Sequence, residues 1–131
     1  MIKVMICDDM EDIRSYLENN ISAETDMEVV GVTSSGEESV QCAIAKQPHV
    51  ILMDVQMPVM NGREAAKAIR RLPRKDAGEI LIFALSADAF VEDERRSLES
   101  GMNGHYAKPV DFEALQKNVG AILREKERCS R

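Results

Sequence analysis

Residues with acidic, hydroxyl or amine side chains stand directly after four apolar runs of this 131-residue chain. If those runs are parallel strands of one open sheet, their carboxyl ends share one edge, and ligands bind in the crevice beyond it. Any one of these residues is readily explained as a loop residue or a helix cap, but four corresponding positions favour a common site. The residues are Asp8 and Asp9 after the first run, Asp54 after the third, Ser86 after the fourth and Lys108 after the fifth.

The chemistry that suits this set is the handling of a phosphoryl group. Three carboxylates held close together repel one another, so we expect a cation to accompany them. Lys108 supplies one positive charge, and Mg²⁺ is a divalent ion that binds carboxylates, waters and phosphate oxygens. The cation and Lys108 would neutralise phosphoryl oxygens, and Ser86 could donate a hydrogen bond to them. On these grounds alone Asp54 is either a metal ligand or a nucleophile.

Five short apolar runs predict the strands that position these residues. The first, third and fourth runs are nearly continuous in apolar residues and are expected inside the sheet, whereas the other two carry polar residues and are expected at its edges. Helical stretches alternate with the runs, which predicts an α/β fold: a doubly wound, five-stranded parallel sheet of flavodoxin-like order 2-1-3-4-5 with helices on both faces. The runs are Ile2–Cys7, Glu28–Val32, Val50–Met53, Ile80–Leu85 and a weaker one at His105–Ala107.

Capping and breaking residues mark the helices between these strands. Ser35-Gly-Glu-Glu38 predicts a capping box at the start of the second helix, and Pro73 ends the third. Gly101 is expected as the C-cap of a fourth helix, Ala89–Ser100, and Asp111 as the cap of a fifth. In the turn Asn61-Gly62, the glycine is expected to supply a permissive backbone dihedral angle. The inward faces are predicted to be Ile13, Tyr16, Leu17 and Ile21; Val40, Ala43 and Ile44; Ala65, Ala66, Ile69 and Leu72; and Leu115, Val119 and Ile122.

The composition excludes several classes of protein. The length corresponds to one domain, which we place at residues 1–124. Residues 125–131 lack apolar periodicity and are expected to be a fraying helix end or a tail. A net charge of -6 argues against direct nucleic-acid binding. Three scattered cysteines argue against a disulfide framework and indicate a reducing compartment. No apolar run is long enough for a membrane span or a signal peptide, so we expect a cytoplasmic protein.

Four motifs resemble those of two-component response-regulator receiver domains, the CheY-like family. They occur in the family's order and extend the similarity over nearly the whole chain. The motifs are Ile6-Cys-Asp-Asp9, Ile51-Leu-Met-Asp-Val-Gln-Met-Pro-Val-Met-Asn-Gly62, Ala84-Leu-Ser-Ala87 and Tyr106-Ala-Lys-Pro109.

This resemblance implies a role for each matching residue. Asp54 corresponds to the phosphoacceptor, which takes the phosphoryl group from a phosphohistidine. Asp8, Asp9, Asp54 and the backbone carbonyl of Gln56 correspond to the protein ligands of Mg²⁺. Ser86 and Lys108 correspond to the groups that bind the phosphoryl oxygens, and Ser86 and Tyr106 correspond to the switch pair. On the residues alone, Tyr106 is equally well explained as an aromatic residue of the edge strand that packs against the last helix. The bond between Lys108 and Pro109 is expected to be cis, and Gln56 and Asp88 border the path of the water that removes the phosphoryl group.

The resemblance also implies partners. A sensor histidine kinase or a phosphotransfer protein would dock on the first helix and the loop at Pro109, and a separate effector protein would receive the output. Asn103, Gly104 and His105 stand where many DNA-binding regulators carry paired acids. The charged dimer contacts of that subgroup are therefore not assumed, although a phosphorylation-dependent dimer stays open.

Three other functions are compatible with parts of this sequence. A flavin protein of the same fold is disfavoured because Asp8-Asp-Met-Glu-Asp12 would repel a phosphate and because Trp is absent. A phosphatase of the haloacid-dehalogenase type carries a second Asp two residues after its nucleophile, where this chain has Gln56. An unphosphorylated receiver-like scaffold, acting only as a protein-interaction module, is the remaining alternative.

Overall fold

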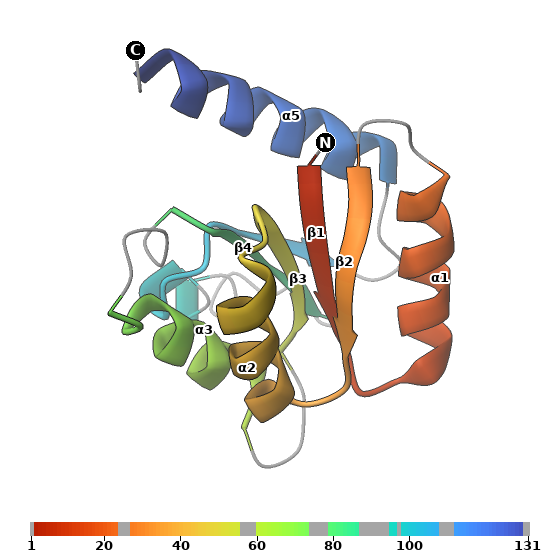
Figure 1. Cartoon of the computed structure of the whole chain (residues 1–131), viewed down its shortest axis with the longest axis vertical. Coiled ribbons are helices and arrows are strands. Elements are labelled where there is room, and N and C mark those ends of the chain that lie inside the picture. The colour runs from red at the N-terminus through yellow and green to blue at the C-terminus, as the bar shows by residue number, and fades with distance from the viewer. Residues whose placement is uncertain are drawn as a thin grey trace.

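A computed structural model describes residues 2–23, 27–55, 60–73, 79–86, 95–96, 98–107 and 112–129 of the chain. Strands and helices alternate along it as far as the fourth strand, as the apolar patterns predict (Figure 1). The elements are β1 (Ile2–Cys7), α1 (Glu11–Ser22), β2 (Met27–Thr33), α2 (Gly36–Lys46), β3 (Val50–Asp54), α3 (Gly62–Arg70), β4 (Leu81–Ser86), β5 (Gly104–Ala107) and α5 (Phe112–Cys129).

The five strands form one parallel sheet in the order β2-β1-β3-β4-β5, which confirms the predicted topology. β1, β3 and β4 are interior, and their side chains are buried almost throughout. β2 and β5 form the edges, where the sequence carries polar residues and glycine. The strand ends lie one residue from their predicted positions in places, because backbone pairing continues to Asp54 in β3 and to Ser86 in β4.

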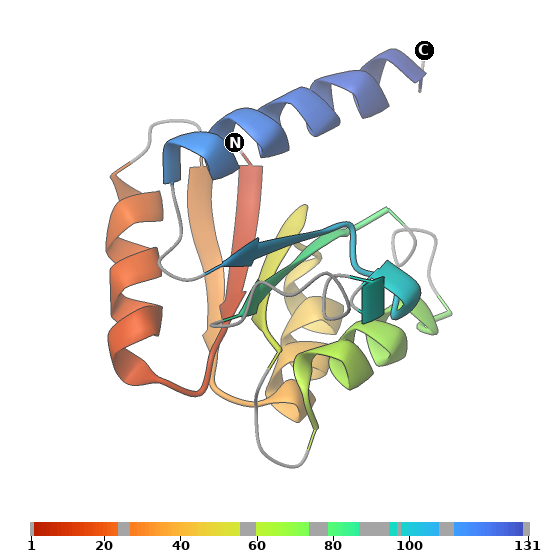
Figure 2. The same ribbon diagram turned by 180° about the vertical axis from the view of Figure 1, so that it is seen from behind.

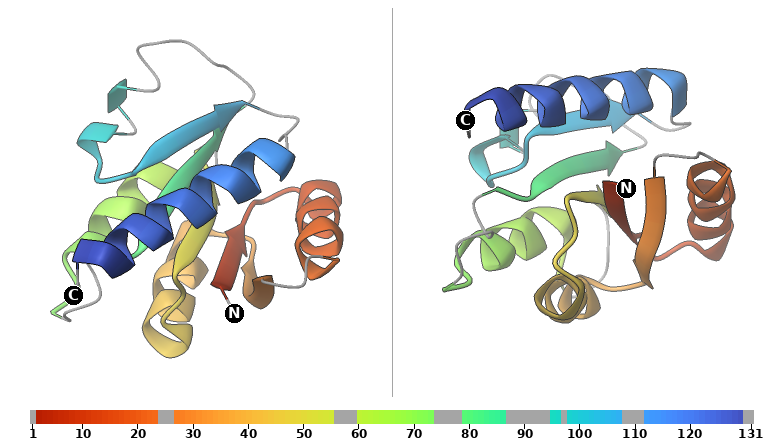
Figure 3. Two further views of the ribbon diagram at one scale, coloured as in Figure 1. Left: turned by 90° about the horizontal axis from the view of Figure 1, so that it is seen from above. Right: turned by 45° about the horizontal axis from the view of Figure 1, so that its top comes forward.

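Helices cover both faces of the sheet (Figure 3). One core cluster lies under α2 and α3 and contains Met5, Met53 and Ile82. The other lies under α1 and α5 and contains Ile6, Leu52 and Phe83. Neighbouring residues of each interior strand thus enter opposite clusters, as the alternation of side chains along a strand requires. Figure 2 shows α5 crossing the sheet, with its carboxyl-terminal end away from the strands.

Two of the predicted inward residues are exposed. Tyr16 is 46% exposed and Ile44 is 41% exposed, so their assignment to the inward faces of α1 and α2 is wrong. Each directly neighbours a fully buried residue, Leu17 or Ala43, and one step along a helix rotates a side chain by about 100°. The buried stripes of these two helices are therefore narrower than the apolar pattern indicates. The inward faces of α3 and α5 follow the prediction, since Ala65, Ala66, Ile69, Leu115 and Val119 are buried and Leu72 and Ile122 pack against the core.

Some predicted boundaries fall outside the described residues. Asp111 does so, and so does most of the predicted fourth helix, of which residues 95–96 and 98–99 are helical. Gly101 follows that segment with a φ of +96°, the conformation expected of a glycine that ends a helix. Helix α5 runs to Cys129 and so includes residues 125–129, which the sequence predicts to be either a fraying helix end or a tail.

Candidate functional site

Asp8 lies directly after β1 and is fully buried. Its backbone N–H donates to the carbonyl of Thr33 at 3.2 Å, which extends the pairing of β1 with β2 by one residue. Its carboxylate Oδ1 accepts a hydrogen bond from the N–H of Met10 at 2.9 Å. Its carbonyl oxygen accepts one from Nη1 of Arg14 at 2.8 Å. These contacts fix both the backbone and the side chain of Asp8 at the edge of the sheet.

Arg14 was not predicted from the sequence as a residue of this site. Its position could have indicated it, because a long cationic side chain in the first two turns of α1 can reach back to the turn that precedes the helix. Arg14 thereby holds the β1–α1 turn, and its positive charge lies next to a group of acidic residues.

Asp54 is the last residue of β3, pairs with Leu85 of β4 and is 4% exposed. Its backbone lies against Gly62, the first residue of α3, so closely that a Cβ at position 62 would overlap the carbonyl oxygen of Asp54. Gly62 has an ordinary negative φ, since Gly101 is the only glycine with positive φ among the described residues. The predicted reason for Gly62 is therefore wrong: this position requires glycine for close approach to Asp54, not for its dihedral angle.

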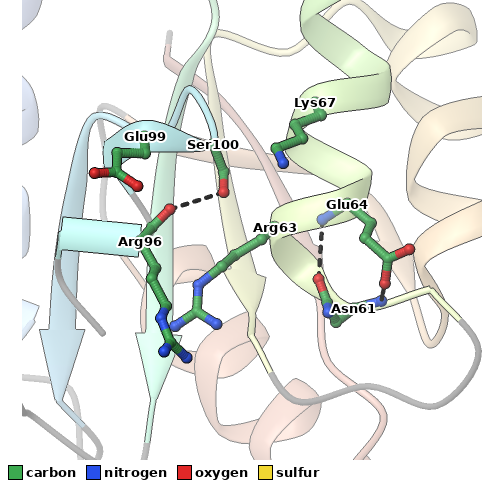
Figure 4. A pocket seen from close by; sticks show the side chains of 7 residues that line it. All are labelled: Asn61, Arg63, Glu64, Lys67, Arg96, Glu99 and Ser100. Atoms are coloured by element: carbon green, nitrogen blue, oxygen red, sulfur yellow. Dashed lines mark hydrogen bonds between the residues drawn. The ribbon is translucent and has the colours of Figure 1, made fainter. Parts of the chain in front are cut away.

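The start of α3 is held by a reciprocal pair of hydrogen bonds. The side chain of Asn61 accepts from the N–H of Glu64 at 2.9 Å, and the Glu64 carboxylate accepts from the N–H of Asn61 at 3.3 Å (Figure 4). The sequence predicts a capping box at Ser35 instead. There only the first half forms: the Ser35 hydroxyl accepts from the N–H of Glu38, and the Glu38 carboxylate accepts from the hydroxyl of Ser34.

The carboxylates of Asp8, Asp9 and Asp54 converge at the carboxyl edge of the sheet. One oxygen of each lies within 4.8 Å of the others, with Asp8 and Asp54 buried and Asp9 exposed. Two adjacent strand ends, β1 and β3, thus bring the three acids together. A set of oxygen donors open to solvent on one side fits a hard divalent cation such as Mg²⁺, which retains part of its water shell.

Ser86 and Tyr106 lie on the neighbouring strands. Ser86 ends β4, is 4% exposed and pairs with Ala107, while Tyr106 pairs with Leu85. The ring of Tyr106 meets Phe83 edge-on with centroids 5.5 Å apart. The Tyr106 hydroxyl accepts a hydrogen bond at 3.1 Å from the side-chain amide of Asn118 in α5. Tyr106 therefore connects the edge strand to the last helix, as an aromatic packed there would.

Cys7 lies immediately before the acidic group and is fully buried. Burial raises the pKa of the Cys7 thiol to about 11, and the negative charges of Asp8 and Asp54 add to this effect. The thiol donates a hydrogen bond to the carbonyl of Ser35 at 3.2 Å. Cys7 is thus a neutral, buried core residue at neutral pH, and its thiol is poorly suited to act as a nucleophile.

A separate hollow of about 280 Å³ lies between α3 and the helical residues before Gly101 (Figure 4). Arg63, Lys67 and Arg96 line it together with Glu64 and Glu99. Because charges of both signs share its walls, nothing in it selects a ligand of one charge. We therefore place the candidate site at the acidic group and not in this hollow.

Four of the residues singled out from the sequence, Gln56, Asp88, Lys108 and Pro109, lie outside the described part of the chain. The structure brings together Asp8, Asp9 and Asp54 and places Ser86 on the adjacent strand end.

Comparison with known proteins assigns the family. The model of the response regulator receiver domain matches residues 4–120. The chain belongs to this family. This receiver domain is 36% identical to the response regulator protein VraR of Staphylococcus aureus over 129 residues, which is 97% of this chain and 57% of VraR. The receiver domain thus spans a little over half of that relative's length.

Solved structures agree with this assignment. The receiver domain superimposes on the Vibrio cholerae chemotaxis protein CheY4 with a TM-score of 0.81 and 29% identity, covering 92% of this chain and 98% of CheY4. It superimposes on the receiver domain of Saccharomyces cerevisiae Ssk1, solved as a complex with the histidine phosphotransfer protein Ypd1, with a TM-score of 0.78 and 31% identity. That match covers 90% of this chain and 86% of the other. Among the described residues of the receiver domain, none of the helices has the length and apolar character needed to cross a membrane.

Proposed function

We propose that this receiver domain accepts a phosphoryl group on Asp54 from a phosphohistidine of a partner protein, in a reaction that requires Mg²⁺. The observation that carries the proposal is the convergence of Asp8, Asp9 and Asp54 within 4.8 Å at the carboxyl edge of the sheet. Such a group of acids is costly for the metal-free fold because the carboxylates repel one another. A site that binds a cation and a phosphoryl group explains why the fold tolerates it.

In the proposed reaction a carboxylate oxygen of Asp54 attacks phosphorus. An O–P bond forms, the N–P bond of the phosphohistidine breaks, and the departing imidazole keeps the electron pair and takes up a proton. The rigid position of Asp54 at the end of β3, set by strand pairing and by Gly62, keeps its side chain beside Asp8 and Asp9. The product is an aspartyl phosphate on this chain.

Asp8, Asp9, Asp54 and the carbonyl of Gln56 would hold the metal. When bound, Mg²⁺ supplies positive charge that offsets the carboxylates and the oxygens of the transferred group. The hydroxyl of Ser86 would donate a hydrogen bond to one phosphoryl oxygen and the ammonium of Lys108 would pair with another. A cis bond between Lys108 and Pro109 would orient that lysine, and Gln56 and Asp88 would set the rate at which water removes the phosphoryl group.

The signal would leave through the Ser86 and Tyr106 pair. When Ser86 turns to the phosphoryl group, Tyr106 is free to rearrange, and its bond with Asn118 links that change to α5. The output surface is then the one formed around β5 and α5, where a separate effector protein or a second phosphorylated copy would bind.

The donor would be a sensor histidine kinase or a phosphotransfer protein in the cytoplasm. The Ssk1 receiver, 31% identical to this chain, is complexed with such a phosphotransfer protein. Helix α1 and the preceding turn lie beside the acidic group and expose Met10 (54%) and Tyr16 (46%). These apolar side chains are suited to docking the donor next to Asp54.

The proposal is tested by incubating the domain with a small phosphodonor, with and without Mg²⁺, and measuring the intact mass. We expect one base-labile phosphoryl adduct that depends on Mg²⁺ and is absent from Asp54→Asn. Asp12→Asn removes an exposed carboxylate of α1 that is not part of the acidic group and is the matched control. An adduct that persists in Asp54→Asn would refute the assignment of the acceptor. No adduct in any variant would favour an unphosphorylated scaffold.

A further inference from the structure

Arg70, the last residue of α3, holds three acceptors with its guanidinium group. Nε donates to the carbonyl of Gly101 at 2.9 Å, and Nη1 donates to the carbonyl of Ile80 at 2.6 Å. Nη2 donates to the side-chain oxygen of Asn103 at 2.7 Å. Arginine is the side chain that offers several N–H donors in one rigid plane, so a single residue can tie these segments together.

Asn103 in turn forms a two-bond bridge to Ile82. Its backbone N–H donates to the carbonyl of Ile82 at 2.7 Å, and its side-chain oxygen accepts from the N–H of Ile82 at 2.9 Å. The side-chain amide thus replaces the backbone carbonyl that a regular strand partner would supply. This bridge stands immediately before the first regular pair of β4 and β5, Phe83 with Gly104.

Strand β5 is a four-residue edge strand, Gly-His-Tyr-Ala. Among the described residues, Tyr106 packs against Phe83 and accepts a bond from Asn118, and the bridge at Asn103 adds a second anchor at the start of the strand. Register is weakly specified in such strands, and a shift by one residue turns every side chain to the opposite face. In the observed register Tyr106 stands opposite Leu85 and Ala107 stands opposite Ser86.

We propose that Arg70 is a positioning residue for the switch. By holding Gly101 and Asn103, it fixes the register of β5. That register pairs Ala107 with Ser86 and so places Tyr106 at the neighbouring position. Arg70 contacts the segments that precede β4 and β5, at the amino ends of the strands. The acidic group lies at their carboxyl ends. The inference rests on the proposed function of the Ser86 and Tyr106 pair and adds the residue that aligns them.

Close packing supports this role. A Cβ at Gly101 would lie 3.0 Å from Cγ of Arg70, and Gly101 holds its positive φ directly over that side chain. Burial lowers the pKa of Arg70, which is the expected effect when a guanidinium loses water and its bonds run to neutral oxygens. The side chain remains charged at neutral pH.

The test compares Arg70→Met with Arg71→Met, which removes an exposed arginine at the next position. Amide hydrogen exchange is measured for Tyr106 and Ala107 in β5 and for Met5 and Leu52 in the interior strands. We expect exchange in β5 to become about tenfold faster in Arg70→Met, with the interior strands changed less than about twofold. Arg71→Met should match the wild-type protein at all four positions.

A second measurement separates positioning from simple stabilisation. The amide resonances of Tyr106 and Ala107 are followed as Mg²⁺ and beryllofluoride, an analogue of the phosphoryl group, are added. In the wild-type protein we expect both resonances to shift; in Arg70→Met the shifts should fall by half or more, while phosphorylation of Asp54 stays within about twofold. A uniform rise in exchange across all strands with an unchanged Tyr106 response would overturn the proposal.

Two more variants define the contact. Arg70→Lys keeps the charge but cannot hold three acceptors in one plane, so it should behave like Arg70→Met; full restoration by lysine would overturn the role of the planar group. Asn103→Ala leaves Arg70 in place and should also accelerate exchange at Tyr106, and it serves as the test if Arg70→Met does not fold. If the wild-type protein shows no response to beryllofluoride, the proposed function fails, whereas exchange in β5 without Mg²⁺ still tests the role of Arg70.

Discussion

Gly62 lies against the backbone carbonyl of Asp54, with no room between them for a side chain. The first residue of α3 thus touches the last residue of β3, and a hydrogen bond from the N–H of Gly62 to the carbonyl of Val55 at 3.0 Å holds the two segments together. This contact leads to the first prediction, because any substitution at Gly62 must displace the residue that we propose as the phosphoacceptor.

Gly62→Ala should lower the free energy of unfolding by about 1–3 kcal/mol, since a Cβ is forced against a backbone atom in a buried place. It should also slow phosphorylation of Asp54 because the strand end must move. Urea unfolding and the intact-mass assay check the two effects. Lys67→Ala, at an exposed position of the same helix, should change stability by less than about 0.5 kcal/mol. Equal stability of Gly62→Ala and the wild-type protein would contradict the close approach.

Asp9→Asn should make the metal-free domain more stable and its stability less sensitive to Mg²⁺. Removing one carboxylate relieves repulsion within the acidic group, but it also removes an oxygen donor. For the wild-type protein we expect a gain of about 2.7 kcal/mol when free Mg²⁺ exceeds its Kd about 100-fold. Chemical denaturation with and without Mg²⁺ measures both effects. If Mg²⁺ stabilised Asp9→Asn as much as it stabilises Asp12→Asn, Asp9 would not be a ligand of the metal.

His49 should make stability depend on pH. Its Nδ1 accepts a hydrogen bond from the N–H of Lys3 at 2.9 Å, and burial, followed by the nearby charge of Lys3, lowers its pKa. The unfolded chain then binds a proton more readily than the folded one, so stability is complete above the ordinary pKa of about 6.5 and declines as pH falls.

The check is the difference in unfolding free energy between the wild-type protein and His49→Asn at several pH values. The asparagine oxygen can accept the same bond but does not titrate, and all other titrating groups are shared by the two proteins. The wild-type protein should lose stability relative to the variant between about pH 7.5 and pH 5.5. A constant difference would show that the bond to Lys3 does not depend on protonation.

Cys7 should resist thiol reagents as long as the domain is folded. With a pKa of about 11, only about one thiol in a thousand is ionised at pH 8, and the side chain is fully buried as well. Cys42 is half-buried and should react faster. Labelling followed by peptide mass spectrometry, in native buffer and in urea, distinguishes the two. Rapid native labelling of Cys7 would show that the site opens more readily than its packing indicates.

The strand order and the edge of the sheet at which the acidic residues meet could both be predicted from the sequence. Apolar runs with and without polar interruptions separate edge strands from interior strands, because interior strands are buried on both faces. The acids at the ends of the first and third runs then had to meet, because β1 and β3 are adjacent and parallel. These features follow from local pattern and sheet topology, and neither depends on the details of packing.

The buried face of each helix and the contacts of each loop residue depend on packing, so they are seen only in the folded chain. The apolar patterns of α1 and α2 contain Tyr16 and Ile44, but the width of the buried stripe depends on how far each helix stands over the sheet. The reason for Gly62 is a carbonyl eight residues earlier in the chain, and the register of β5 depends on Arg70 and Asn103 from two separate segments. Contacts of this kind join residues from separate segments, so they cannot be predicted from local patterns in the sequence.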